Sequence, residues 1–229
     1  MRERFDLRSA APRLPGLLVG LVAFGIGVAL MVESGLGLSP WEVLHQGISV
    51  RTGIPIGTVS IMLGVVVLLL WIPIGERPGI GTVANIALIG STTNVTLGIL
   101  PDLGPFTFEG AEPADLLARA GLVLGGILVI GVGSGFYLGA DLGPGPRDGL
   151  MTGLHRRYGW SIRRVRTALE IGVLVVGFLL GGTIGIGTIL FAVLIGPLVQ
   201  LFLGLLDREG RISRARRAEI AEEAELAGE

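Results

Sequence analysis

Runs of about twenty apolar residues recur along this chain, and they constrain its fold more than any other feature. The hydrocarbon core of a bilayer is about 30 Å thick, so a helix needs about 20 apolar residues to cross it. Half of the 229 residues are hydrophobic, which is high for a water-soluble domain. We therefore expect an all-α membrane protein. Six segments are long enough to cross: 14–33, 56–74, 79–100, 116–138, 162–180 and 184–206.

The placement of arginine predicts the orientation of these crossings, because loops rich in basic residues remain cytoplasmic. Six crossings put both termini on one side of the membrane. If this side is the cytoplasm, roughly 16 of the 18 basic residues lie in inner loops or at inner helix ends. The exceptions are Arg51 and Arg119, and the expected outer loop 101–116 has no basic residue. The N- and C-termini are therefore predicted to be cytoplasmic.

The chain also contains an internal repeat. Laying each residue over the one 106 positions later aligns 13–100 with 119–206 without a gap, and about 27 of the 88 aligned positions are identical. Each copy holds three crossings, an odd number, so the second copy inserts upside down relative to the first, as in many transporters. We predict six transmembrane helices as two inverted three-helix repeats. The predicted parts are a cytoplasmic N-terminus (1–13), repeat 1 (14–100), an outer loop (101–116), repeat 2 (117–206) and a cytoplasmic charged tail (207–229).

Each repeat has a short polar segment after its first crossing, and these two segments begin with similar residues. Proline is favoured at the first position of a helix, and serine or glycine at the position before it. The predicted helix starts are Ser39 and Pro40 in the first copy and Gly145 and Pro146 in the second. Both segments are too short and too polar to span, so we predict a short non-spanning helix in each repeat.

An acidic residue lies in the first turn of each short helix. Glu42 can complete a capping box with Ser39, and Asp148 has the equivalent position in the second copy. In the functional interpretation, the two helices enter the membrane from opposite faces and bring their N-termini near the midplane, where a solute, cation or proton meets them. His45 and Arg147 then join the candidate ligands. In the structural alternative, the carboxylates only cap helices that lie flat at the interface.

A charged face begins the fifth crossing. Arg163, Arg166, Thr167 and Glu170 have the spacing i, i+3, i+4, i+7, which puts them on one stripe of a helix. An unpaired carboxylate at the depth of Glu170 is costly in hydrocarbon, so we expect it to pair with Arg166 or to be protonated. The alternative is a surface ion pair whose side chains reach the interface.

Amide side chains form a third group of candidates. Asn85 and Asn94 lie in the third crossing, and Gln200 is the counterpart of Asn94 in the sixth. Amides inside hydrocarbon commonly bond a neighbouring helix, which is a packing role. The functional alternative is that they line a pore.

Two motifs resemble those of a known family. Residues 35–47 (GLGLSPWEVLHQG) and 143–151 (GPGPRDGLM) look like the YczE/YyaS/YitT-like family of bacterial integral membrane proteins. The resemblance covers most of the chain, roughly 13–206, and the second motif is the more distinctive. It implies a location in the bacterial cytoplasmic (inner) membrane. That family has no agreed substrate, so no residue role is carried over.

The residue inventory narrows the chemistry. The chain has no cysteine and only two histidines, so thiolate metal sites and a histidine cluster are excluded. No nucleophile–base pair is evident in the sequence, so we expect no enzyme activity. We also expect no cofactor, no metal and no nucleic-acid partner. We predict a small secondary transporter or channel in the lipid bilayer, with a site for a small solute or ion between the repeats. The alternative is an accessory or substrate-binding subunit of a larger transport, export or biosynthetic complex. A homodimer also remains open.

Overall fold

The computed structural model describes residues 10–104, 106–107 and 112–206, and within them it is helical, with no strand. The predicted charged tail 207–229 and most of the predicted N-terminus lie outside the described residues. The all-α prediction is confirmed for the described part. The helices are α2 (Leu14–Ser34), α3 (Pro40–Thr52), α4 (Ile56–Leu69), α5 (Trp71–Ile74), α6 (Ile80–Leu97), α7 (Pro113–Ala140), α8 (Pro146–Tyr158), α9 (Ile162–Leu179) and α10 (Ile186–Leu206).

The helices form a membrane protein. Within the described residues, 5 helices are long and apolar enough to cross a bilayer: α2, the continuous stretch of α4 and α5, α6, α7 and α10. Their outer faces carry large exposed apolar side chains, such as Ile72 and Leu117. Such a surface is stable against lipid rather than water. The helix α9 is long enough to cross, but its first turns carry the charged face predicted from the sequence.

Proline and glycine explain where several helices begin and end. Pro73 has no N–H to donate to the carbonyl of Leu69, and the helix is interrupted at Leu70, between the end of α4 and the start of α5. Helix α7 begins at Pro113, a few residues before the predicted start of the crossing, because proline suits the first turn and Asp115 adds favourable negative charge there. The first residues of α7 therefore belong to the segment 101–116 that was predicted as an outer loop.

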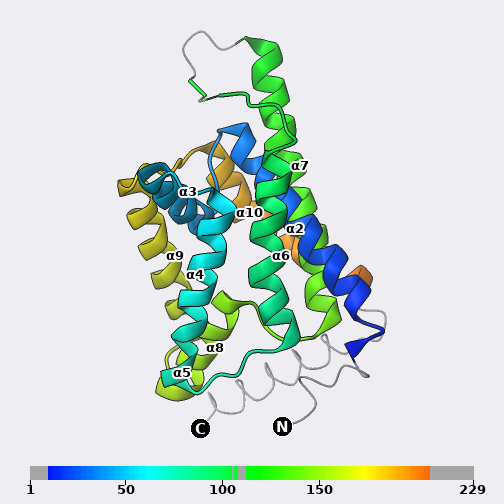
Figure 1. Ribbon diagram of the computed structural model, residues 1–229, viewed down its shortest axis with the longest axis vertical. Helices are drawn as coiled ribbons and strands as arrows, with labels where there is room; N and C mark the ends of the chain where they lie inside the picture. Colours follow the sequence, from blue (N-terminus) through cyan, green and yellow to red (C-terminus); the bar gives the residue numbers. More distant parts are fainter. Residues whose placement is uncertain (1–9, 105, 108–111, 207–229) are drawn as a thin grey trace.

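Hydrogen bonds between distant segments recur at the 106-residue offset of the sequence repeat. The N–H of Gly81 donates to the carbonyl of Leu142 at 2.8 Å, and the N–H of Gly187 donates to the carbonyl of Leu36, also at 2.8 Å. In each case the start of the third long helix of one repeat bonds the loop that precedes the short helix of the other repeat. The two short helices lie far apart along the vertical axis of Figure 1, α3 near the upper end and α8 near the lower.

The first long helices of the two repeats, α2 and α7, cross in direct contact. A Cβ atom on Gly20 would lie 2.7 Å from the carbonyl oxygen of Gly133, and a Cβ on Gly126 would lie 2.7 Å from that of Gly27. Only glycine permits so close a crossing. The crossing stabilises the centre of the molecule, and the site described next lies on one side of it.

Candidate functional site

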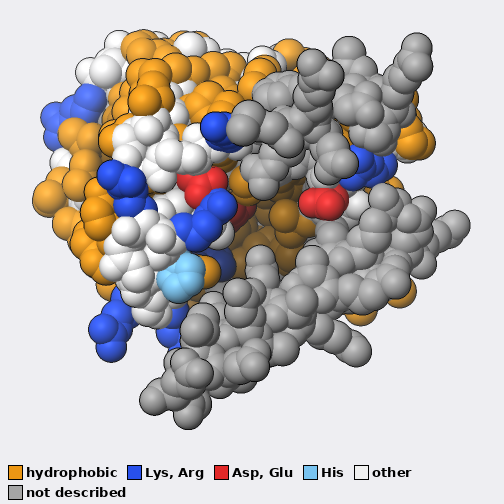
Figure 2. All heavy atoms as spheres, turned by 90° about the horizontal axis from the view of Figure 1, so that it is seen from below, with side chains coloured by type: hydrophobic (Ala, Val, Ile, Leu, Met, Phe, Trp, Pro, Cys, Tyr) orange, Lys and Arg blue, Asp and Glu red, His pale blue; other side chains and the backbone are white. Residues whose placement is uncertain are grey.

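A cavity of about 300 Å³ lies between the short helices and the long helices around them. The first turns of α3 and α8 both contribute to its wall. Figure 2 shows a hollow on the lower face of the molecule, with hydrophobic side chains inside it and acidic and basic side chains at its edge. The cavity brings together seven of the nine candidate ligands singled out in the sequence: Glu42, His45, Asn85, Arg147, Asp148, Arg166 and Glu170.

An ion pair joins the first turns of the two short helices. The guanidinium of Arg147 donates from Nη2 to Glu42 Oε1 at 2.9 Å, between residues 105 positions apart. The Glu42 side chain is 8% exposed, and His45 Nδ1 lies 3.9 Å from the same oxygen. Arg147 also lies over the ring of Trp41, with Cζ 4.7 Å from the ring centroid. The carboxylate and the guanidinium therefore compensate each other in a partly desolvated place.

This ion pair replaces the capping box expected from the sequence, and that expectation was wrong. Ser39 precedes α3 as its N-cap residue, but its side chain makes no capping hydrogen bond. The Glu42 carboxylate accepts instead from the guanidinium of Arg147. A charged partner binds a carboxylate more strongly than a neutral backbone N–H does, and this partner comes from the other repeat.

Asp148 has no such partner. Its carboxylate makes no hydrogen bond or ion pair with any residue that the structure describes. Asp148 is exposed, and it is one of the residues that line the cavity. A Cβ atom on Gly145 would lie 3.3 Å from Asp148 Oδ2, 3.1 Å from the hydroxyl oxygen of Tyr137 and 3.7 Å from Nδ2 of Asn85. Three polar groups thus lie around the space that a side chain at position 145 would occupy.

The charged face of α9 contributes a second ion pair to the cavity. Arg166 donates from Nε to Glu170 Oε1 at 3.0 Å, and both residues line the wall. The other two members of the predicted stripe, Arg163 and Thr167, are exposed and lie outside the cavity lining. The pair therefore adds no net charge to the cavity lining.

Two of the amide candidates lie away from the cavity. Asn94 accepts from the N–H of Gly57 at 2.8 Å and donates to the hydroxyl of Thr58 at 3.0 Å, so it joins α6 to α4. Gln200 is exposed on α10. Neither residue lines the cavity, and Asn94 has the packing role that was the alternative for these amides.

The structure adds residues that the sequence did not single out. Tyr137 lines the cavity near the end of α7, and its hydroxyl donates to the carbonyl of Gly143 at 3.4 Å. The indole N–H of Trp71 donates to the carbonyl of Pro146 at 3.0 Å, which holds the start of α8. Tyr137 was detectable in the sequence as an aromatic residue with a polar tip at the end of an apolar run. Within the described residues, no group of three or more His, Cys, Asp or Glu side chains is placed to hold a metal ion.

Comparisons with known proteins agree with the resemblance in the motifs. Residues 11–204 match the model of a family described as a family of unknown function, DUF6198. The chain is 45% identical over 192 residues to an uncharacterized protein of Haemophilus influenzae, covering 84% of both chains. It is 34% identical over 186 residues to the uncharacterized membrane protein YczE of Bacillus subtilis, covering 80% of this chain and 82% of that one. It is 28% identical over 200 residues to the uncharacterized protein YyaS of the same organism, covering 87% of this chain and 96% of that one. No solved structure matches.

Proposed function

The chain belongs to the family of unknown function DUF6198, and on that premise we propose that it is a small secondary transporter whose solute site lies between two inverted repeats. The proposal includes a sixth crossing, made by α9. Its three arginines lie in the first turns, and Glu170, at the middle of the helix, is paired with Arg166 in the cavity wall, so the apolar second half can lie in lipid. With α9 counted, each repeat contributes three crossings.

The inverted arrangement is supported by contacts that each repeat makes with the other at equivalent positions. Besides the paired bonds of Gly81 and Gly187, the guanidinium of Arg13 donates to the carbonyl of Ala140 at 3.4 Å, and that of Arg119 donates to the carbonyl of Ser34 at 3.1 Å. All four residues of these arginine contacts are related by the same offset of 106. Reciprocal contacts of this kind are expected when two copies are related by a pseudo-two-fold axis.

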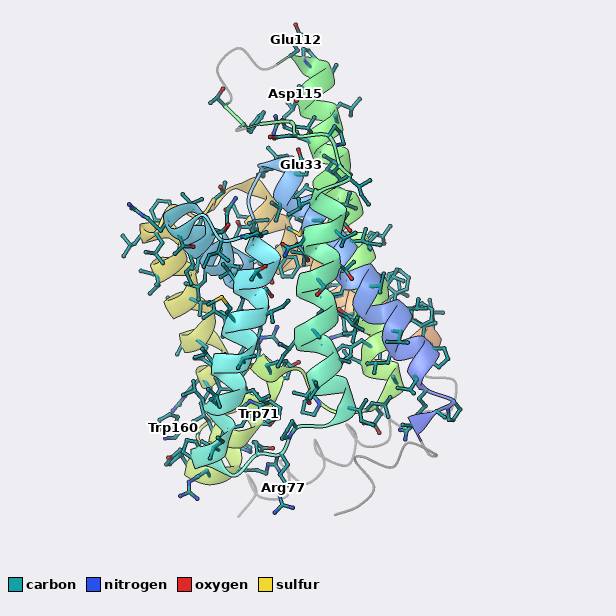
Figure 3. All side chains as sticks on the ribbon, viewed as in Figure 1. Glu33, Trp71, Arg77, Glu112, Asp115 and Trp160 are labelled. Atoms are coloured by element: carbon teal, nitrogen blue, oxygen red, sulfur yellow. The ribbon has the colours of Figure 1, made fainter. Side chains whose placement is uncertain are left out.

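The two ends of the molecule differ in charge. Figure 3 shows Glu33, Glu112 and Asp115 at the upper end, and Arg77 with Trp160 at the lower end. Basic residues mark the cytoplasmic side of a membrane protein, and tryptophan favours the interface. We therefore propose that the lower end faces the cytoplasm, in a bacterial inner membrane.

We infer that the cavity opens at the lower face, where Figure 2 shows a hollow. Leu36 and Leu38, in the loop between α2 and α3, pack in one apolar cluster with Ile130 of α7, and both Leu38 and Ile130 line the cavity. A channel needs a continuous path, whereas a transporter exposes its site to one side at a time. The packing thus favours a transporter in its inward-open state.

The observation that carries the proposal is the Glu42–Arg147 ion pair. It joins the first turn of the short helix of one repeat to the first turn of the short helix of the other, and both residues line the cavity. Such an ion pair can form when the site is open to one side of the membrane and break when the site is open to the other. A rocking motion of one repeat against the other would alter the pair directly.

The test is solute uptake by proteoliposomes that contain only this protein. Stopped-flow light scattering after mixing with each member of a panel of amines, amino acids, sugars and alkali salts reports which solute enters. Glu42→Gln should lower the uptake rate at least about tenfold, because it leaves the Arg147 charge without its counter-ion. The matched control is Glu112→Gln, since Glu112 is exposed at the start of α7 and far from the cavity.

Folding must be separated from function in this experiment. The variants are compared by size-exclusion elution and thermal unfolding in detergent. Arg147→Gln should slow uptake as Glu42→Gln does, whereas Arg156→Gln, whose ion pair with Glu76 lies outside the cavity, should leave it unchanged. Full uptake by well-folded Glu42→Gln and Arg147→Gln proteins, or no uptake of any solute by the unaltered protein, would reject the transporter.

A further inference from the structure

The cavity contains one negative charge more than it contains positive charges. Glu42, Asp148 and Glu170 supply three carboxylates, and Arg147 and Arg166 supply two guanidiniums. Two of the carboxylates are bonded to the two guanidiniums, at 2.9 Å and 3.0 Å. Counting His45 as neutral, Asp148 is the carboxylate whose charge remains for a ligand.

The surroundings of Asp148 suit a donor group. The Tyr137 hydroxyl oxygen can accept a hydrogen bond, and the amide of Asn85 presents its oxygen when it turns by 180°. Both lie on the same face of Gly145 as Asp148 Oδ2. A protonated amine offers two or three N–H donors and a positive charge, so these three acceptors match it in number and in charge.

The remaining walls favour an organic body over a bare ion. Leu63, Val67, Ile86 and Met151 line the cavity beside the polar niche. A hydrated alkali ion gains nothing from such walls, whereas an alkyl or aromatic group loses contact with water there. The volume of about 300 Å³ is at the small end of ligand sites, which suits a small molecule.

We propose that the cavity binds small primary amines in their ammonium form, with the nitrogen at the Asp148, Tyr137 and Asn85 niche beside Gly145 and the apolar part against the aliphatic wall. This inference rests on the proposed transport function, because it names the class of solute carried. The ammonium group brings the charge of the cavity to zero.

Binding is measured by isothermal titration calorimetry on the full-length protein in detergent, with benzylamine and butylamine as probes. Benzyl alcohol tests the need for charge, tetramethylammonium the need for N–H donors, and sodium chloride a bare cation. The amines should bind, and each of the other three should bind at least about tenfold more weakly. Equal binding of benzyl alcohol, or binding of sodium in place of the amines, would overturn the proposal, as would no saturable binding of either amine.

Asp148→Asn removes the charge while keeping the shape of the side chain. It should weaken benzylamine binding at least about tenfold. The matched control is Asp141→Asn, the same change at the residue that follows α7. Asp141 is exposed and does not line the cavity. Its backbone is left-handed, a conformation that asparagine tolerates. Unchanged affinity in the Asp148→Asn protein would overturn the proposal.

A second variant keeps the test valid if Asp148→Asn fails to fold. Gly145→Ser introduces the residue that occupies the equivalent position in the first repeat, and the backbone of Gly145 has an ordinary φ of −61°. Serine is a good N-cap residue, so the helix should be kept. Its Cβ would lie 3.1 Å from the Tyr137 hydroxyl and fill the niche. A folded Gly145→Ser protein with undiminished amine affinity would also overturn the proposal.

The outcome separates this inference from the transport proposal. If the proteoliposomes take up another class of solute and the amines do not bind, the transporter stands and the amine site falls. Moving the charge gives a further check, because Asn85→Asp in the Asp148→Asn background returns a carboxylate to the same niche. Affinity should recover at least in part, whereas a purely structural role of Asp148 predicts no recovery.

Discussion

At Gly149, in the second turn of α8, there is no room for a side chain. A Cβ atom there would lie within the ring of Trp71, and Trp71 is fully buried and donates its N–H to the carbonyl of Pro146. The glycine therefore permits the contact that holds the start of α8 against α5. Its backbone is helical, so the requirement is one of space and not of conformation.

Gly149→Ala should destabilise the protein by about 1–3 kcal/mol, because Trp71 must move and its hydrogen bond is strained. The control is Gly139→Ala in α7, where a Cβ would meet nothing within 4 Å. Alanine at that position should be neutral or stabilise by up to about 1 kcal/mol. Thermal unfolding in detergent measures both, and equal unfolding temperatures for the two variants would show that the Trp71 contact does not limit stability.

At each end of the α2–α7 pair an arginine bonds a neighbouring segment of the chain, and the contacts of these two arginines differ in strength. The Arg119 side chain, 3% exposed, bonds Asp115 at 2.9 Å and the carbonyls of Ser34, Leu103 and Gly104, and it lies over Phe106. Its counterpart Arg13 donates to the carbonyls of Ala140 and Asp141 at 3.4 Å and 3.2 Å. The upper contact is the more buried and the shorter of the two, as expected if the lower end is the one that opens, as we propose.

Weakening the upper contact should favour opening of the upper side. In sealed right-side-out vesicles, a cysteine in place of the buried Leu36 should react several-fold faster with an external, impermeant maleimide after Arg119→Gln. Arg13→Gln, the equivalent change at the lower end, should not increase this rate. Equal labelling rates in the Arg119→Gln and unaltered backgrounds would mean that Arg119 only packs the loop.

The whole molecule is predicted to have its short helices on opposite sides of the membrane. Thr52 ends α3 and Tyr158 ends α8, both are exposed, and the chain has no native cysteine to interfere. In intact cells, Thr52→Cys should react with an impermeant thiol reagent and Tyr158→Cys should react only after permeabilisation. Labelling of both from the same side would remove the inverted arrangement and, with it, the shared central site.

The fold class and the starts of the short helices follow from the sequence alone, because they depend on local chemistry. Apolar length predicts helices for a bilayer, and the short helices begin at Pro40 and Pro146, where proline suits the first turn. The pairing of α3 with α8 is different. Glu42 had a local option, the capping box with Ser39, and a distant one, Arg147, and the spacing of residues along the chain does not rank the two.

Only the tertiary structure decided between those options, since packing brings a guanidinium from 105 residues away to the carboxylate and leaves Asp148 without a partner. It also separated Asn85, which faces the cavity, from Asn94, which bonds α4, although both are asparagines of the same helix. Periodicity gives each side chain a direction around its own helix axis, but what lies in that direction depends on neighbouring helices. The charge left over for a ligand is thus a property of the assembled repeats.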